Sequence, residues 1–304
     1  MNSPGVSSTP YRTIGIACAL AGVLAFSAKA VVAKLMYRHG IDAVTLMAMR
    51  MSIALPIFIG IGLWIAHRTK APRISRREWV TMIAIGFTGY YAASFLDFIG
   101  LQYVTAGIGR LILFAYPTIT VAISALFLKR RVTRAEVMAL LITYAGVALV
   151  LSNAISGQQV NLPLGALLIS GAAFFTAVFL VWSAESIRRV GSMRFTAYAM
   201  SIAALPSILQ FPLLRPMSAL DLPLEAWGLA LLLSVMCTVL PLFLTAEALK
   251  RVGANHVSLL GALGPVMTIL ISNVVLGESM MPLQWVGALL VMAGVALVTM
   301  RPSR

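Results

Sequence analysis

The chain has 304 residues, of which 60% are hydrophobic and 11% are charged. A soluble domain is about 45–50% apolar and about 25% charged, so a soluble fold of this length could not cover so much apolar surface. The 23 Lys and Arg residues outnumber the 9 Asp and Glu residues, a balance that raises the question of nucleic-acid binding. We exclude that partner because the basic residues lie between apolar runs and form no stripe with interleaved aromatic residues.

Cysteine and histidine give no sign of catalysis or of a metal centre. Cys18 and Cys237 both lie inside apolar segments, so no disulfide framework is implied. The three histidines fall at segment ends and are far apart in sequence. Because no spacing suggests a metal site or a nucleophile triad, we expect neither an enzyme nor a cofactor.

Ten apolar runs are long enough to cross a membrane, since a spanning helix needs about 20 mostly apolar residues. The first run exceeds the core of a signal peptide and has no clear cleavage site, so we expect it to remain as a transmembrane helix. The predicted fold is therefore an all-α polytopic membrane protein with short connections. The runs are 13–37, 42–66, 80–101, 104–128, 135–152, 163–184, 195–214, 226–246, 254–276 and 283–300.

The distribution of basic residues predicts the orientation of these runs. With the N-terminus in the cytoplasm, 17 of the 23 basic residues fall in inside segments and two in outside loops. Four lie within helices. Because cytoplasmic loops are enriched in Lys and Arg, this split predicts a multi-pass protein of the cell inner or plasma membrane with both termini in the cytoplasm.

The second half of the sequence repeats the first. Residues 95–151 align without a gap on residues 243–299, and 18 of the 57 positions are identical. Pro117 matches Pro265, and Ala145–Val150 recurs as Ala293–Val298. We therefore predict one repeat over 13–151 and a second over 163–299. Five helices per repeat would make the second copy enter the membrane from the opposite side, a topology found in many secondary transporters.

These features resemble the drug/metabolite transporter superfamily in its EamA branch. The resemblance rests on the ten runs, the tandem halves and the positive inside loops. The resemblance implies transport driven by an ion gradient or by exchange, without ATP hydrolysis, and does not specify the cargo. The local matches are Phe26-Ser27-Ala28-Lys29, Met49-Arg50, Leu101-Gln102-Tyr103-Val104-Thr105-Ala106, and the Pro117 and Pro265 helices, each followed by a glycine-rich helix.

Four charged residues lie inside the predicted helices at similar depths. At 1.5 Å per residue, Lys29 and Arg50 are each ~12 Å from the outer end of their helix, Arg110 ~9 Å and Asp97 ~6 Å. Charges in the hydrocarbon usually face a cavity. We therefore predict that the three cations hold an anionic group of the substrate while Asp97 pairs with one of them in the empty site. For Arg50 the alternative is a structural role, as the partner of Asp97 or as a cap on backbone carbonyls of a neighbouring helix. For Lys29 the alternative is snorkelling to the surface. Lys34 lies one turn from the surface, so we expect it to snorkel.

Aromatic and proline residues complete the predicted substrate site. Proline frees backbone carbonyls that something must satisfy, so the matched Pro117 and Pro265 point to a site, with packing kinks as the alternative. Tyr90 shares a face of small and polar residues with Asp97, where it could contact substrate or fill a gap between helices. Phe114 lies shortly before Pro117 and could form an aromatic wall.

We therefore expect a secondary active transporter of a small metabolite working by alternating access, with an amino acid or another carboxylate as a candidate. A cation or drug exporter of the same superfamily and a membrane protein without transport activity are the alternatives. A cation exporter would need a carboxylate deep in its site, whereas the excess charge here is positive. The expected partners are the substrate and the lipid bilayer, and a homodimer is compatible with the sequence.

Overall fold

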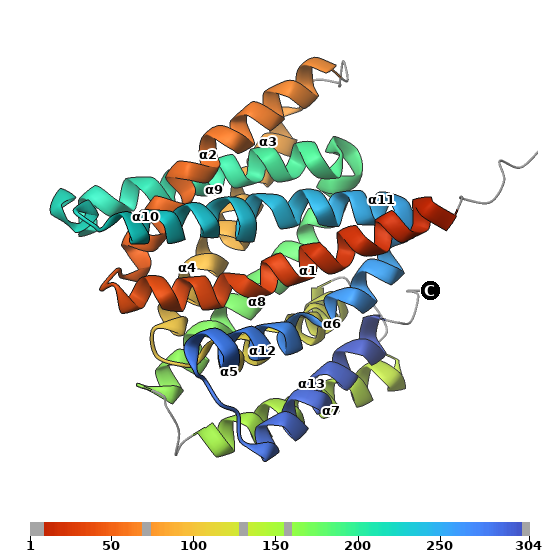
Figure 1. The fold of residues 1–304 in the computed structure, drawn as a ribbon. Helices are drawn as coiled ribbons and strands as arrows, with labels where there is room; N and C mark the ends of the chain where they lie inside the picture. Colours follow the sequence, from red (N-terminus) through yellow and green to blue (C-terminus); the bar gives the residue numbers. More distant parts are fainter. Residues whose placement is uncertain (1–8, 69–73, 128–132, 155–159, 300–304) are drawn as a thin grey trace, which may run out of the picture.

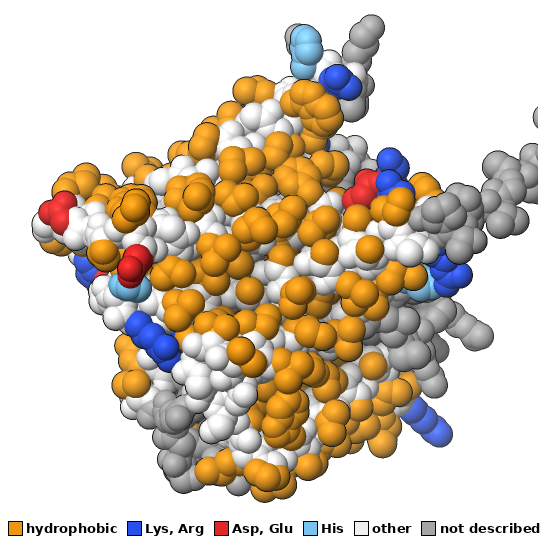
Figure 2. Space-filling view, viewed as in Figure 1, with side chains coloured by type: hydrophobic (Ala, Val, Ile, Leu, Met, Phe, Trp, Pro, Cys, Tyr) orange, Lys and Arg blue, Asp and Glu red, His pale blue; other side chains and the backbone are white. Residues whose placement is uncertain are grey.

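The computed structural model describes residues 9–68, 74–127, 133–154 and 160–299, and every regular element in these ranges is a helix. Helices are expected because lipid offers no hydrogen-bond partners to an exposed backbone. Figure 2 shows hydrophobic side chains across the middle of one face, with charged side chains towards its edges. The elements are α1 (Thr9–Arg38), α2 (Ala43–Arg68), α3 (Arg76–Ile85), η1 (Gly86–Ala92), α4 (Ala93–Leu101), α5 (Ala106–Leu113), α6 (Tyr116–Phe127), α7 (Arg134–Ala154), α8 (Leu162–Val190), α9 (Ser192–Leu214), η2 (Met217–Leu220), α10 (Leu224–Leu231), η3 (Leu232–Val239), α11 (Leu240–Gly261), α12 (Gly264–Leu276) and α13 (Pro282–Thr299).

Eight helical stretches of the described chain are long and apolar enough to cross a membrane. Two further apolar helices, Gly264–Leu276 and Pro282–Leu297, are shorter. The prediction of a polytopic helical membrane protein is confirmed, but the expected ten long spans are only partly matched.

The helices differ from the expected runs in three places. The run 104–128 matches one long apolar stretch, Ala106–Phe127, but residues 114–115 divide this stretch into α5 and α6 just before Pro117. The run 254–276 is divided between α11 and α12 just before Pro265. Proline has no backbone N–H to donate to the preceding turn. Conversely, α11 continues through residues 247–253, which the charges suggested were a loop. There Arg251 Nε donates to Glu247 Oε1 at 2.7 Å, a spacing of four residues that supports a helix.

The two halves of the chain run in opposite directions. Helix α1 begins at the end of the molecule where α13 finishes, whereas α8 begins at the other end (Figure 1). We call the end where α1 begins the terminal end. We call the opposite end, where α1 finishes at Arg38, the distal end. Successive helices then cross the bundle between these two ends.

Helix pairing follows the internal repeat. In the repeat, α1 corresponds to α8, α2 to α9 and α7 to α13. Helix α1 packs along α11 and α12, and its counterpart α8 packs along α4 and along α5 and α6. The pairs α2–α9 and α7–α13 each join a helix to its own counterpart. Exchanging the repeats therefore reproduces the same set of neighbours.

Irregular backbone also recurs in both repeats. The π-helical segment η1 lies between α3 and α4, and the π-helical segment η3 lies between α10 and α11. With the sequence offset of 148 residues, these two segments overlap. The helix breaks before Pro117 and Pro265 coincide by the same offset. π-helical segments and helix breaks are frequent at functional sites. Their repetition indicates that the two halves use the same irregular backbone at equivalent positions.

Close backbone contact between α7 and α13 depends on glycine. A Cβ atom added to Gly146 would lie 2.7 Å from the carbonyl oxygen of Gly287 and 2.8 Å from the amide nitrogen of Val291. We expect Gly146→Ala to lower the stability of the protein by about 1–3 kcal/mol, because backbone atoms must move apart to admit the methyl group. Gly60→Ala in α2 is the matched control, since nothing lies within 4 Å of its added Cβ. The stability of both variants would be measured by unfolding in detergent. Equal stability of Gly146→Ala and Gly60→Ala would contradict this packing.

Candidate functional site

Four charged side chains from four helices meet in the distal half of the bundle. Lys29 comes from α1, Arg50 from α2, Asp97 from α4 and Arg110 from α5. Each residue is buried, with 3–6% of its surface exposed. We call these four residues the charge cluster. Their helices all come from the first repeat, and α11 and α12 of the second repeat pack against α1 beside them.

Lys29 and Asp97 form the ion pair of the charge cluster. Lys29 Nζ lies 2.9 Å from Asp97 Oδ2. The same ammonium lies 4.6 Å from the centre of the Phe98 ring and 5.7 Å from that of Phe26. Aromatic faces attract cations electrostatically, so these rings replace part of the hydration that Lys29 loses on burial.

Arg110 carries a buried positive charge without a hydrogen-bonded counterpart. Its Nε, Nη1 and Nη2 atoms are all buried and have no hydrogen-bond partner among the described residues. The guanidinium carbon lies 5.4 Å from the centre of the Phe26 ring. A buried donor without an acceptor costs about 1–3 kcal/mol, and more when the group is charged. The site is therefore stabilised by any acceptor that reaches Arg110.

Arg50 also has buried donor atoms without a hydrogen-bonded acceptor among the described residues. Its Nε and Nη2 atoms are buried without a hydrogen-bond partner in the described part of the chain, and its guanidinium carbon lies 4.9 Å from the centre of the Phe98 ring. Three cations thus share one carboxylate, and that carboxylate is bonded to Lys29. A planar guanidinium presents a fork of N–H donors that suits a carboxylate or a phosphate. The arrangement can hold one further anionic group.

The remaining residues that the sequence suggested lie around this cluster at different places. Tyr90, in η1, packs against Phe179 of α8 with ring centres 4.7 Å apart. This contact joins the repeats, and no described contact brings the Tyr90 side chain to the cations. Phe114 caps α5 and lies edge-on to Tyr116, with ring centres 6.0 Å apart. This contact places two aromatic rings side by side at the break between α5 and α6.

The two prolines begin helices rather than kink them. Pro117 is the second residue of α6, and Pro265 is the second residue of α12. At the second break, Ser27 Oγ donates to the carbonyl oxygen of Gly264 at 3.0 Å. Thr268 Oγ1 donates in return to the carbonyl oxygen of Ser27 at 3.1 Å. The broken helix of the second repeat is therefore bonded to α1 two residues before Lys29.

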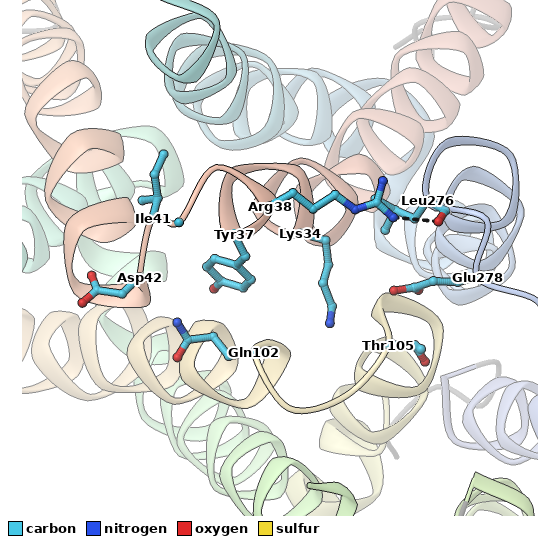
Figure 3. A pocket seen from close by; sticks show the side chains of 10 residues that line it. Lys34, Tyr37, Arg38, Ile41, Asp42, Gln102, Thr105, Leu276 and Glu278 are labelled. Atoms are coloured by element: carbon cyan, nitrogen blue, oxygen red, sulfur yellow. Dashed lines mark hydrogen bonds between the residues drawn. The ribbon is translucent and has the colours of Figure 1, made fainter. Parts of the chain in front are cut away.

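A pocket of about 620 Å³ opens at the distal end of the bundle. We call it the distal pocket; Figure 3 shows the side chains that line it. Sequence reasoning missed this site because it is built from loop residues and helix ends of both repeats. Its lining is Lys34, Tyr37, Arg38, Gly40, Ile41, Asp42, Gln102, Thr105, Leu276 and Glu278.

Polar bonds between the repeats close the distal end around this pocket. Arg38 Nη2 donates to the carbonyl oxygen of Leu276 at 2.7 Å (Figure 3). The amide of Ala106 donates to Glu278 Oε2 at 2.8 Å. Burial raises the pKa of Glu278 above its ordinary value, although nearby Lys34 and the amide donors of α5 act against this shift. The Arg38 bond joins the first repeat to the end of α12, and the Ala106 bond joins it to the loop that follows α12.

The two ends of the bundle differ in how tightly they pack. At the distal end, residues 106–112 of α5 are all buried. Their described counterparts in the second repeat lie at the terminal end, where His256 is 3.2 Å from Arg12 of α1. His256 is exposed and Leu260 is half-buried, whereas their partners by the 148-residue offset, Ile108 and Ile112, are buried. The described residues of this segment are therefore more buried at the distal end than at the terminal end.

Comparison with known proteins decides the family. The sequence profile of the EamA-like transporter family matches residues 13–152 and again residues 163–300. The chain belongs to this family. The two matches give this EamA-like protein a two-repeat architecture, and with the apolar helices they establish it as a multi-pass membrane protein. No group of three or more His, Cys, Asp and Glu residues in the described part could hold a metal ion.

Its relatives carry transporter names. The protein named Uncharacterized transporter YcbK of Bacillus subtilis (strain 168) is 28% identical over 278 residues, which cover 88% of this chain and 87% of that protein. The Probable terminal-alkyne amino-acid exporter of Streptantibioticus cattleyicolor is 26% identical over 79% of this chain and 80% of its own. A solved crystal structure with 22% identity superposes with a TM-score of 0.64 over 96% of each chain, which shows the shared fold.

Proposed function

We propose that this protein is a secondary active transporter of a small metabolite with a carboxylate group, an amino acid being the leading candidate. The observation that carries the proposal is Arg110, a fully buried guanidinium with no hydrogen-bond acceptor among the described residues. A carboxylate would supply that acceptor and would offset the positive excess of the charge cluster. An amino-acid exporter among the relatives agrees with this choice.

Alternating access between two inverted repeats is the proposed mechanism. Helices α1 and α8 run in opposite directions, and exchanging the repeats reproduces the helix pairing (Figure 1). In such a fold, each repeat can adopt the conformation of the other. The buried Ile112 and its half-buried counterpart Leu260 would then exchange environments, which would close the terminal end and open the distal end.

The proposed topology has ten crossings, with both termini in the cytoplasm. The last part of α11 and the short α12 would together form the ninth crossing, and α13 the tenth. The charge distribution supports this orientation, because basic residues in the inside segments outnumber those in the outside loops by 17 to 2. The membrane would be the cell inner or plasma membrane, and the distal end would lie on its non-cytoplasmic side. We propose transport without any catalytic activity.

A thermal-shift screen followed by flux measurement tests the proposal. Purified protein would be screened against amino acids and mono- and dicarboxylic acids, each beside its neutral amide. We expect at least one acid to raise the unfolding temperature while its amide does not. That acid should also exchange across proteoliposomes containing the protein. Stabilisation by amines alone, or stabilisation by an acid without any flux, would overturn the proposal.

A further inference from the structure

The distal pocket contains one cation whose charge is not matched by a bonded partner. Arg38 is bonded to the carbonyl oxygen of Leu276, and the Glu278 carboxylate accepts from the amide of Ala106. Asp42 pairs with Arg215. Lys34, by contrast, makes no hydrogen bond or ion pair with the described residues. The pocket therefore offers an ammonium group that has no hydrogen-bonded partner among the described residues, although the Glu278 carboxylate lies near enough to attract it.

The position of Lys34 places this ammonium inside the pocket rather than at its rim. In Figure 3 the side chain extends from α1 across the pocket towards α4 and α5, where Gln102 and Thr105 lie. The side-chain amide of Gln102 has no hydrogen bond within the described part of the chain either. This course is compatible with the snorkelling expected from the sequence, because the half-buried Lys34 side chain carries its ammonium group into a pocket that opens at the distal end. A volume of about 620 Å³ is within the usual range for a small-molecule pocket.

Tyr37 connects the lining of the pocket to the charge cluster through Phe98. Tyr37 lines the pocket, and its hydroxyl donates to the carbonyl oxygen of Phe98 at 2.7 Å. The Phe98 ring in turn contacts Lys29 and Arg50. Lys34 and Lys29 are five residues apart on α1, which is ~7.5 Å along the helix axis and about 140° around it. The link between the pocket and the buried site is therefore made by Tyr37 and Phe98.

We propose that the distal pocket is a second, outer binding station for the carboxylate group of the transported metabolite, with Lys34 as its cationic partner. This inference rests on the proposed function, because it assigns the same substrate class to both stations. An anion would bind Lys34 first at the distal end. It would then pass Tyr37 to reach Arg110, or follow the reverse route during export.

Charged thiol reagents test the pocket without knowledge of the substrate. Both native cysteines would be replaced by serine, and Gln102→Cys would serve as the reporter in detergent-purified protein. We expect the anionic 2-sulfonatoethyl methanethiosulfonate to react faster than its trimethylammonium analogue by about tenfold, after normalisation to exposed Ser218→Cys, because one unit charge at contact range acts oppositely on the two reagents. Lys34→Gln is expected to abolish this preference, and Lys34→Arg to retain it.

The outcome separates this inference from the proposed function. Equal normalised rates of the two reagents at Gln102→Cys, or a preference that survives Lys34→Gln, would overturn the outer station. The buried site is probed independently by Arg110→Gln, which is expected to lower flux by about 10–100-fold and to leave the reagent preference at Gln102→Cys within about twofold. Flux at the wild-type rate in Arg110→Gln would overturn the proposed function while the result in the distal pocket still stands.

Discussion

Arg110→Gln is expected to lower metabolite exchange by about 10–100-fold, because a hydrogen bond to a charged group contributes about 1.5–3 kcal/mol. The same variant should be at least as stable as the wild type, since it removes a buried charge that has no bonded acceptor in the described chain. Flux in proteoliposomes and thermal unfolding in detergent measure the two effects. Arg110→Lys should recover part of the flux, because it restores the charge but not the planar fork.

The combination of lost flux and retained stability separates binding from structural support. The matched control is Arg188→Gln, which removes an exposed arginine paired with Glu185 and should leave both measurements unchanged. A purely structural Arg110 would show the opposite pattern, in which stability falls and flux falls only as folded protein is lost. That pattern would contradict the anion site.

Asp97→Asn is expected to destabilise the protein by about 3–5 kcal/mol, the usual cost of removing one member of a buried ion pair. The substitution leaves Lys29, Arg50 and Arg110 buried together without their shared carboxylate. Lys29→Gln should cost less, because Asp97 would still experience the charges of Arg50 and Arg110. Denaturant unfolding of the single variants measures this difference.

The double variant Lys29→Gln/Asp97→Asn provides the control for this pair. Its stability should exceed that of Asp97→Asn, since the second substitution removes one of the uncompensated cations. Simple addition of the two single-variant losses would show that Lys29 and Asp97 do not act together. An Asp97→Asn variant as stable as the wild type would show that the carboxylate does not balance the cluster.

Sequence spacing predicts that Lys29, Arg50, Asp97 and Arg110 lie at similar depth, because helices rise by a constant amount per residue. Their meeting in one cluster needed the arrangement of α1, α2, α4 and α5, which depth alone does not determine. The residues that complete the cluster were missed. Phe26 and Phe98 are aromatic residues in apolar helices, and nothing in their sequence distinguishes a ring that faces a cation from one that faces lipid.

The helix boundaries show the same limit. The proline matches at Pro117 and Pro265 marked the correct places, but a kink and a break have the same sequence signature. Glu247 and Arg251 form the ion pair that is expected of neighbouring opposite charges, but this pair lies within α11 rather than in a loop between two helices. Lys34 was set aside because its distance from the helix end allows snorkelling. Only the structure shows the pocket into which it extends.

Cysteine accessibility at repeat-related positions tests alternating access most directly. Ile112→Cys and Leu260→Cys, each made without the native cysteines, would be labelled with a membrane-impermeant maleimide from either side of the membrane. Leu260→Cys should react from the side of the termini and Ile112→Cys from the other side. Weakening the distal bonds with Arg38→Gln and Glu278→Gln should then raise labelling at position 112 and lower it at position 260. Labelling of both positions from the same side, or a change at one position without the opposite change at the other, would contradict two inverted repeats that open one site alternately.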